Sequence, residues 1–211
     1  MNRLTQHFFS VPTGVFTQPG AAVVVDGSDF SRHGLVKRAL ANGEILDIRR
    51  GLYCLAPRYQ KKPVSIYGLA QRVHGPSYIS LETALSYHGC IPEAVHACTC
   101  VSAGRAREFI TPLGLFSYKR VPQRTFYVGV ERCVDPDGNT WFMASPAKAL
   151  ADYVYVHRPS WTTIDEASAN LRIEAEELAG VTPEQLDDLI DNYSNCRVRC
   201  FLATWKKALS Q

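Results

Sequence analysis

Features typical of membrane and secreted proteins are missing from this sequence of 211 residues. No uninterrupted apolar run approaches the roughly 18 residues that a membrane-spanning helix needs, so we expect no such helix. The first residues, MNRLTQHFFSVPTGVF, lack the continuous apolar stretch and the small-residue cleavage site of a signal peptide. The seven cysteines are an odd number, which favours free thiols over a disulfide framework. These absences predict a cytoplasmic protein that has no membrane partner.

Recognisable catalytic signatures are also missing. The sequence contains no GxSxG, HExxH or Walker A motif, and no set of nucleophile, base and orienting residue stands out. We therefore expect neither enzyme activity nor a cofactor.

One group of residues resembles a metal site, and it consists of His88, Cys90, His96, Cys98 and Cys100. Zinc ligand pairs are usually separated by about two to four residues on a turn. Cys98 and Cys100 are instead two apart on a predicted strand, where their side chains share one face. We therefore interpret them as buried thiols and predict no metal.

The most informative stretch runs from residue 28 to residue 55. Apolar residues recur on one helical face, at Leu35, Val36, Ala39 and Leu40. Gly43 is typical of the position just after a helix, and segments 45–49 and 52–55 around Arg50-Gly51 predict a hairpin. A basic helix followed by a basic-tipped hairpin is typical of a winged helix-turn-helix, whose helix enters the DNA major groove. The same order of elements also occurs in α+β proteins that bind no nucleic acid.

The distribution of charge favours the DNA-binding interpretation. Residues 1–62 contain nine Lys/Arg and four Asp/Glu, a net charge of +5, whereas the remaining residues sum to −2. A basic segment attached to a mildly acidic body indicates a module that binds a polyanion.

Candidate DNA contacts fall into two groups. Ser31, Arg32 and His33 precede the first apolar anchor of the helix and are predicted to meet base edges, with Arg32 contacting a guanine. Basic residues farther along the helix, at the wing tip and beyond it are predicted to contact phosphates; they are Lys37, Arg38, Arg49, Arg50, Lys61 and Lys62. Arg32 can instead simply be a solvated residue of an exposed first turn, and the sequence leaves this alternative open.

The chain as a whole predicts an α+β fold with two domains. Residues 56–63 break regular structure, so we place the boundary after residue 60. Residues 1–60 form the predicted winged helix-turn-helix, and residues 61–211 form a mixed α/β domain with an antiparallel-rich sheet and C-terminal helices. The candidate strands are 78–79, 95–101, 108–111, 115–119, 125–131 and 140–143.

Local signals also place several helices. We expect helices at 2–9, with Leu4, Phe8 and Phe9 facing inward, and after the caps Thr17, Ser80, Ser145 and Thr182. The run Ala21 to Val25 is consistent with either a strand or a short helix. The last helix places Val198, Phe201, Leu202, Trp205 and Leu209 on one apolar stripe.

Three segments resemble the AbiEi antitoxin family, the predicted regulators of type IV (abortive-infection) toxin–antitoxin systems. They are residues 43–53 (GEILDIRRGLY), 78–89 (YISLETALSYHG) and 144–152 (ASPAKALAD). Their order and approximate spacing also match, so the likeness covers residues 14–155. The resemblance implies that the first domain represses its own operon by binding operator repeats. It also implies a second domain that counters a nucleotidyltransferase-like toxin, without a stable toxin complex.

The third of these segments contains Lys148 and Asp152, four residues apart on a predicted helix. This spacing is typical of an ion pair on a helix surface, and the resemblance makes the pair a candidate antitoxin surface. The acidic stretch 163–191, with nine acidic residues against Arg172 alone, matches no motif, and the sequence does not show whether it has a partner.

The sequence leaves three function classes open. The first is an operator-binding antitoxin and autorepressor, which the family resemblance favours. The second is a stand-alone winged-helix regulator of a defence locus. The third is a protein-interaction module that does not bind DNA.

Overall fold

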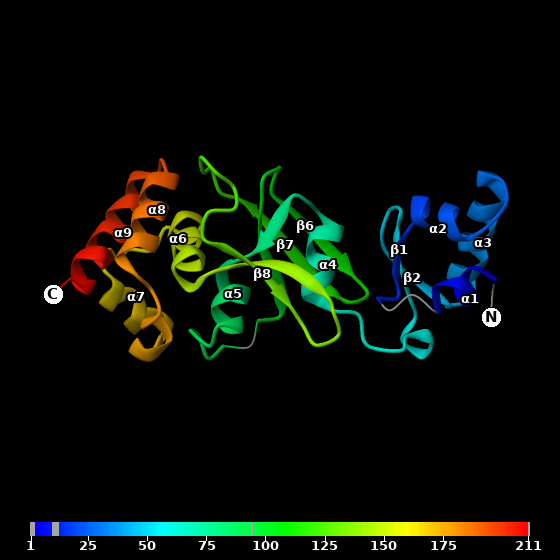
Figure 1. Cartoon of the computed structure of the whole chain (residues 1–211), viewed down its shortest axis with the longest axis horizontal. Helices are drawn as coiled ribbons and strands as arrows, with labels where there is room; N and C mark the ends of the chain where they lie inside the picture. Colours follow the sequence, from blue (N-terminus) through cyan, green and yellow to red (C-terminus); the bar gives the residue numbers. More distant parts are fainter. Residues whose placement is uncertain (1–2, 10–12, 94, 211) are drawn as a thin grey trace.

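The chain forms an elongated molecule built in three consecutive sections. A computed structural model gives its structure and describes residues 3–9, 13–93 and 95–210. A small N-terminal unit lies at one end, a large sheet occupies the middle, and a group of helices lies at the other end (Figure 1). The secondary structure is mixed α+β, as the sequence predicts.

The N-terminal unit combines short helices with a small sheet. Its elements are α1 (Arg3–Phe9), β1 (Val15–Thr17), α2 (Gln18–Val24), α3 (Asp29–Ala41), β2 (Ile45–Arg49) and β3 (Leu52–Leu55). The strands are antiparallel, in the order β1-β3-β2. Thr17 caps α2 as predicted, because its side chain accepts a hydrogen bond from the backbone N–H of Gly20 at 3.1 Å. The run whose sequence was ambiguous is helical through Val24.

A larger sheet fills the middle of the molecule. Its strands are β4 (Ser77–Ile79), β5 (Ala97–Ser102), β6 (Arg107–Thr111), β7 (Gly114–Arg120), β8 (Val130–Val134) and β9 (Thr140–Ala144). They are ordered β6-β7-β5-β4-β9-β8. The pairs β4–β5, β6–β7 and β8–β9 are antiparallel, and β5–β7 and β4–β9 are parallel. Strands distant in sequence therefore meet at the centre of the sheet.

Helices join the sheet to the C-terminal section. They are α4 (Ile66–Val73), α5 (Leu81–Tyr87), α6 (Pro146–His157), α7 (Ile164–Leu171), α8 (Pro183–Asn192) and α9 (Cys196–Leu209), with 3-10 turns at Pro57–Tyr59 and Ala175–Leu178. α4 packs on β4 and β9, and α5 packs on β5 and α6. α6 also contacts α8 and α9, so it links the sheet to the helical end.

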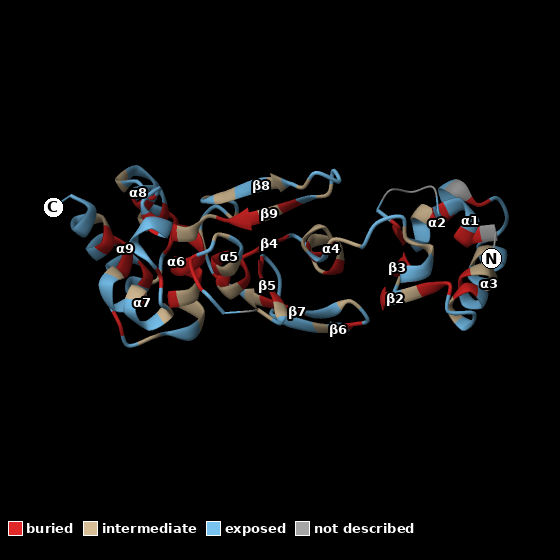
Figure 2. Cartoon of the chain, turned by 90° about the horizontal axis from the view of Figure 1, so that it is seen from below, coloured by how far each residue is buried: buried red, intermediate tan, exposed pale blue. Residues whose placement is uncertain are grey.

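The small sheet is covered by apolar residues on both faces. Tyr53 and Leu55 belong to one cluster with residues of α1, α2 and α3, including Leu4 and Phe8. The alternating residues Leu52 and Cys54 belong to the large core, together with Leu69, Val73 and many residues of the body. β2 also lies against β6. Figure 2 shows buried positions along the central strands and on the inner sides of the helices.

Several sequence predictions need correction. Phe9 does not face inward, because it is 41% exposed and the Lys61 ammonium lies 5.4 Å from the centre of its ring. The candidate strand 125–131 is wrong over most of its length, since β8 begins only at Val130. The backbone N–H of Thr125 donates instead to the side chain of Asn192 at 2.8 Å. The conformation of this segment is fixed by a hydrogen bond to a residue distant in the sequence, so local β propensity could not predict it.

Ser80 also behaves differently from the prediction. It occupies the cap position of α5, but its side chain does not cap the helix. Its hydroxyl donates to Asp152 at 2.7 Å, and the following residue, Leu81, has a positive φ of 57°. The stripe of α9 is confirmed for Val198, Phe201, Leu202 and Trp205, whereas Leu209 is 42% exposed.

Among the described residues, no helix is long and apolar enough to cross a membrane.

Candidate nucleic-acid interface

Helix α3 is fixed at both ends and along one face. At its start, the Ser28 hydroxyl oxygen accepts a hydrogen bond from the backbone N–H of Ser31 at 3.2 Å. At its end, the Arg58 guanidinium donates hydrogen bonds to the carbonyls of Asn42 and Gly43 at 3.0 and 3.2 Å. Carbonyls at the end of a helix have no hydrogen-bond partner within the helix, so Arg58 supplies one. Val36 and Ala39 lie in the core of the unit. The opposite face of α3 is therefore held in a defined orientation.

That opposite face is open and basic. Phe30, Gly34, Lys37 and Ala41 follow one another at helical spacing. Phe30 is 90% exposed, and Lys37 and its neighbour Arg38 are exposed without an ion pair or hydrogen bond within the described part of the chain. Of the predicted base contacts, Ser31 and His33 are also exposed.

Arg32 does not lie on this face. Arg32 precedes Leu35 by three residues and Val36 by four, so it shares their helix face, which is the buried one. Its side chain is only 19% exposed. The guanidinium donates to the carbonyl of Gly27, lies 3.5 Å from the carbonyl of Val25, and pairs with Asp29 at 2.6 Å. These contacts close the turn between α2 and α3. A guanine contact by Arg32 would require all of them to break.

The hairpin of β2 and β3 presents its two tip arginines differently. Gly51 has the positive φ, 80°, that the sequence predicts for this turn. Arg50 is exposed, without a charged partner among the described residues. Arg49 instead donates to the backbone carbonyl of Arg72 in α4 at 3.2 Å.

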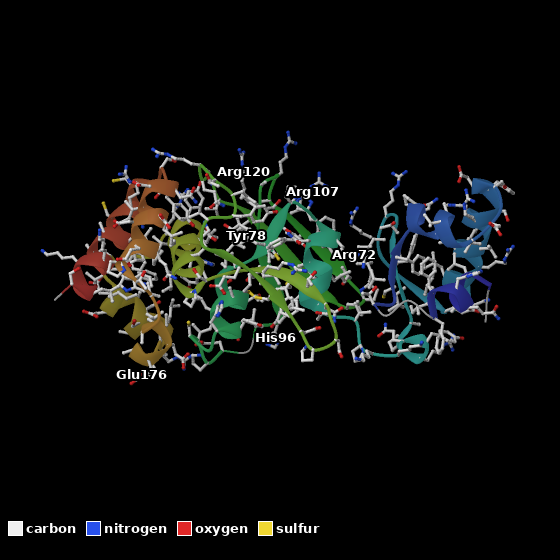
Figure 3. The ribbon with its side chains drawn as sticks, viewed as in Figure 1. Arg72, Tyr78, His96, Arg107, Arg120 and Glu176 are labelled. Atoms are coloured by element: carbon white, nitrogen blue, oxygen red, sulfur yellow. The ribbon has the colours of Figure 1, made fainter. Side chains whose placement is uncertain are left out.

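Arg72 completes the junction between the N-terminal unit and the body. Its own guanidinium donates to the carbonyl of Val15 at 3.1 Å, and burial lowers its pKa. Figure 3 shows Arg72 on the side of the body that faces the N-terminal unit. Of the two tip arginines, Arg50 is therefore the one available to a ligand, and Arg49 serves the junction.

Lys61 and Lys62 are also engaged. Lys61 lies over the ring of Phe9, as described above, and Lys62 pairs with Asp137 in the β8–β9 turn. Lys61 therefore contacts α1 and Lys62 contacts the body, whereas Lys37 and Arg38 belong to the open face of α3.

The candidate antitoxin surface of Lys148 and Asp152 is wrong, because both side chains are completely buried. They are paired at 3.6 Å on α6, which lies between the sheet and the C-terminal helices. A four-residue spacing on a helix predicts that two side chains meet. It does not show which way the helix faces, and here that side faces the interior.

A hydrogen-bonded cluster surrounds this buried pair. Asp152 accepts hydrogen bonds from the hydroxyls of Tyr78, Ser80 and Tyr193 at 3.0, 2.7 and 2.5 Å. Lys148 donates to Tyr193 at 2.6 Å and to the side-chain carbonyl of Gln123. Burial lowers the pKa of Lys148, and the nearby carboxylate opposes this shift. Figure 3 shows Tyr78 within the body. The cluster joins β4, α6, the 121–129 segment and the end of α8.

The cysteine–histidine group behaves as separate residues. Cys98 and Cys100 are buried with their Sγ atoms 3.9 Å apart, which confirms that they share one face of β5. His88 contacts the carbonyl of Ala144 at 2.9 Å, and burial raises the pKa of Cys90 to about 11. Within the described residues, no three His, Cys, Asp or Glu side chains gather as they would around a metal ion.

No protein-family model matches this chain, and no curated protein does either. The geometry of the candidate sites therefore carries the functional argument, together with the sequence resemblance.

One further hollow was not predicted from the sequence. A cavity of about 580 Å³ lies over β5 and β7, with Leu81, Leu115 and Tyr153 among its apolar walls. At its edge, the ring of His157 contacts the carboxylate of Glu82 at 2.7 Å. Burial opposes ionisation of Glu82, but the contact with His157 and the hydrogen bonds from its own backbone N–H and from Thr99 together outweigh burial and lower the pKa of Glu82. The residues that line this cavity come from four separated segments, so no local pattern could identify it.

Proposed function

We propose that residues 1–60 act as a winged helix-turn-helix and that the chain binds double-stranded DNA through this unit. The observation that carries the proposal is the open face of α3. It is held by hydrogen bonds at both ends, and its Lys37 and Arg38 have no ion pair with any residue that the structure describes. It also lies at the end of the molecule farthest from the acidic C-terminal section (Figure 1).

The arrangement of elements supports this interpretation. α2, the turn closed by Arg32, and α3 have the order of a helix-turn-helix, and the β2–β3 hairpin follows directly as a wing. α3 would enter the major groove, while Arg50 would contact a backbone phosphate. An alternative explanation is that Lys37 and Arg38 simply interact favourably with the dipole at the C-terminal end of α3. That interaction does not by itself require both side chains to lack an ion pair among the described residues.

The proposed biological role rests on the sequence resemblance. We propose an antitoxin that represses its own type IV toxin–antitoxin operon and is functionally paired with a nucleotidyltransferase-like toxin. Three segments support this, at residues 43–53, 78–89 and 144–152. Because Lys148 and Asp152 are buried, a surface that counters the toxin would have to be formed by other residues. The third segment is better explained by the buried cluster that it forms.

DNA binding is testable by its dependence on salt. Each phosphate contact that is lost should reduce the slope of log K against log salt concentration by about one unit. We expect Arg50→Ala to reduce this slope by about one and Lys37→Ala/Arg38→Ala by about two, on a random-sequence duplex followed by fluorescence anisotropy.

The chain offers a matched control for the double variant. Arg199 and Lys207 are exposed on α9 at the opposite end of the molecule, so Arg199→Ala/Lys207→Ala removes the same charge elsewhere. This control should keep the wild-type slope. Equal slopes for the two double variants would show that α3 does not face the DNA. A wild-type chain that binds no duplex at low salt would favour the protein-interaction module instead.

The operon role needs a separate measurement. A reporter fused to the promoter upstream of the gene should be repressed by the wild-type chain and released by Lys37→Ala/Arg38→Ala. Repression without any toxin gene beside it would favour the stand-alone regulator.

A further inference from the structure

Phe30 is the least expected residue on the open face of α3. Its side chain is 90% exposed, and its ring makes no aromatic contact within the described residues. Isolated exposed apolar residues are common on protein surfaces. The position of Phe30, and not its exposure alone, is therefore what calls for an explanation.

Phe30 occupies the first turn of α3, the part of a recognition helix that meets base edges. It lies on the same face as Gly34 and Lys37. A side chain at Gly34 would meet only the far end of Arg38, at 3.9 Å, so the surface beside Phe30 is low and open. A DNA groove could approach the helix closely at this point. The acidic residue that precedes Phe30 in the sequence, Asp29, forms an ion pair with Arg32 at 2.6 Å.

A phenylalanine ring has no hydrogen-bond donor or acceptor with which to recognise a base edge. The apolar group that the major groove presents is the 5-methyl group of a pyrimidine, which thymine carries in ordinary DNA. We propose that Phe30 reads a thymine through this methyl group and so sets the sequence preference of the chain. The proposal rests on the proposed function.

The test removes and restores a single methyl group. A duplex that the full chain prefers is first selected from a random library, and each thymine in it is then replaced in turn by deoxyuridine. We expect one replacement to weaken wild-type binding about fourfold, which corresponds to about 0.8 kcal/mol for one buried methyl-sized group. Phe30→Ala should be insensitive to that replacement and should bind the unmodified duplex more weakly.

A matched control is available on the neighbouring helix. Val23 is 86% exposed on α2, so Val23→Ala removes exposed apolar surface without touching the first turn of α3. This variant should keep the full response to deoxyuridine. Neither substitution removes a buried contact, and equal melting temperatures would confirm that both variants remain folded.

A further duplex distinguishes the two pyrimidines that can carry a 5-methyl group. Placing 5-methylcytosine at the responsive position restores the methyl but changes the base pair. Recovery of affinity by this base would mean that Phe30 reads the methyl group alone, as proposed. If sequence-specific binding is present but no thymine is coupled to Phe30, this inference is overturned and the proposed function stands. Absence of DNA binding overturns both.

Discussion

Replacing Lys148 by methionine measures what the buried polar cluster contributes to stability. The ammonium group is completely buried and donates to Tyr193 and Gln123, with Asp152 at 3.6 Å. Methionine has a similar length but no charge and no donor. The variant therefore leaves the Asp152 carboxylate buried without its counter-charge, while its three hydroxyl donors remain in place.

The expected loss of stability is large for a single substitution. Removing one partner of a buried ion pair costs about 3–5 kcal/mol. The hydroxyl groups still stabilise the carboxylate, so we expect a loss near the lower limit, about 3 kcal/mol. For a chain of 211 residues, each kcal/mol shifts the melting temperature by about 2–4 °C, so Lys148→Met should lower it by about 6–12 °C.

Urea unfolding followed by circular dichroism gives the free energy directly. The control is Lys206→Met, which removes a lysine from an exposed pair with Asp187, at 2.6 Å on the outer surface of α9 and α8. Exposed pairs contribute less than about 1 kcal/mol. If Lys148→Met destabilises the chain no more than Lys206→Met, the buried cluster is not a major source of stability.

Two other predictions concern residues described above. Arg32→Ala should destabilise the turn between α2 and α3 and lower the affinity for preferred and random duplexes alike. Competition assays at one salt concentration would measure this. A loss of affinity confined to the preferred duplex would instead indicate that Arg32 contacts a base. Glu82→Gln should be less stable than the wild type at pH 7, and this difference in stability should be smaller at pH 3, as measured by urea unfolding. A carboxyl whose pKa is lowered by folding stabilises the fold above its unfolded pKa, about 4.3, and loses this contribution as pH falls through the folded pKa. A constant difference at both pH values would contradict the role of the His157 contact.

Local chemistry accounts for what the sequence predicted well. A capping side chain, a following proline or a glycine in a tight turn acts within a few residues, so Thr17, Ser145 and Gly51 could be interpreted from their neighbours alone. The α+β class follows from the same local patterns.

Most of the failures depend on contacts between distant parts of the chain, and Arg32 is the exception. Ser80 has the chemistry of a cap, but a carboxylate 72 residues away takes its hydroxyl. Arg32 looked like an exposed polar residue because it precedes Leu35, yet it shares a helical face with Val36 and Ala39. Its position relative to the later apolar residues was the signal that could have corrected this. The direction in which the helix of Lys148 faces had no comparable local signal.

The small sheet has a practical consequence for dissecting this protein. Leu52 and Cys54 lie in the same apolar core as Leu69 and Val73, beyond the boundary that the sequence suggests after residue 60. A fragment cut at that boundary would expose one whole face of its only described sheet to water, and such a surface favours self-association. A soluble fragment that contains the proposed DNA-binding unit should therefore extend through α4, to residue 73 or beyond.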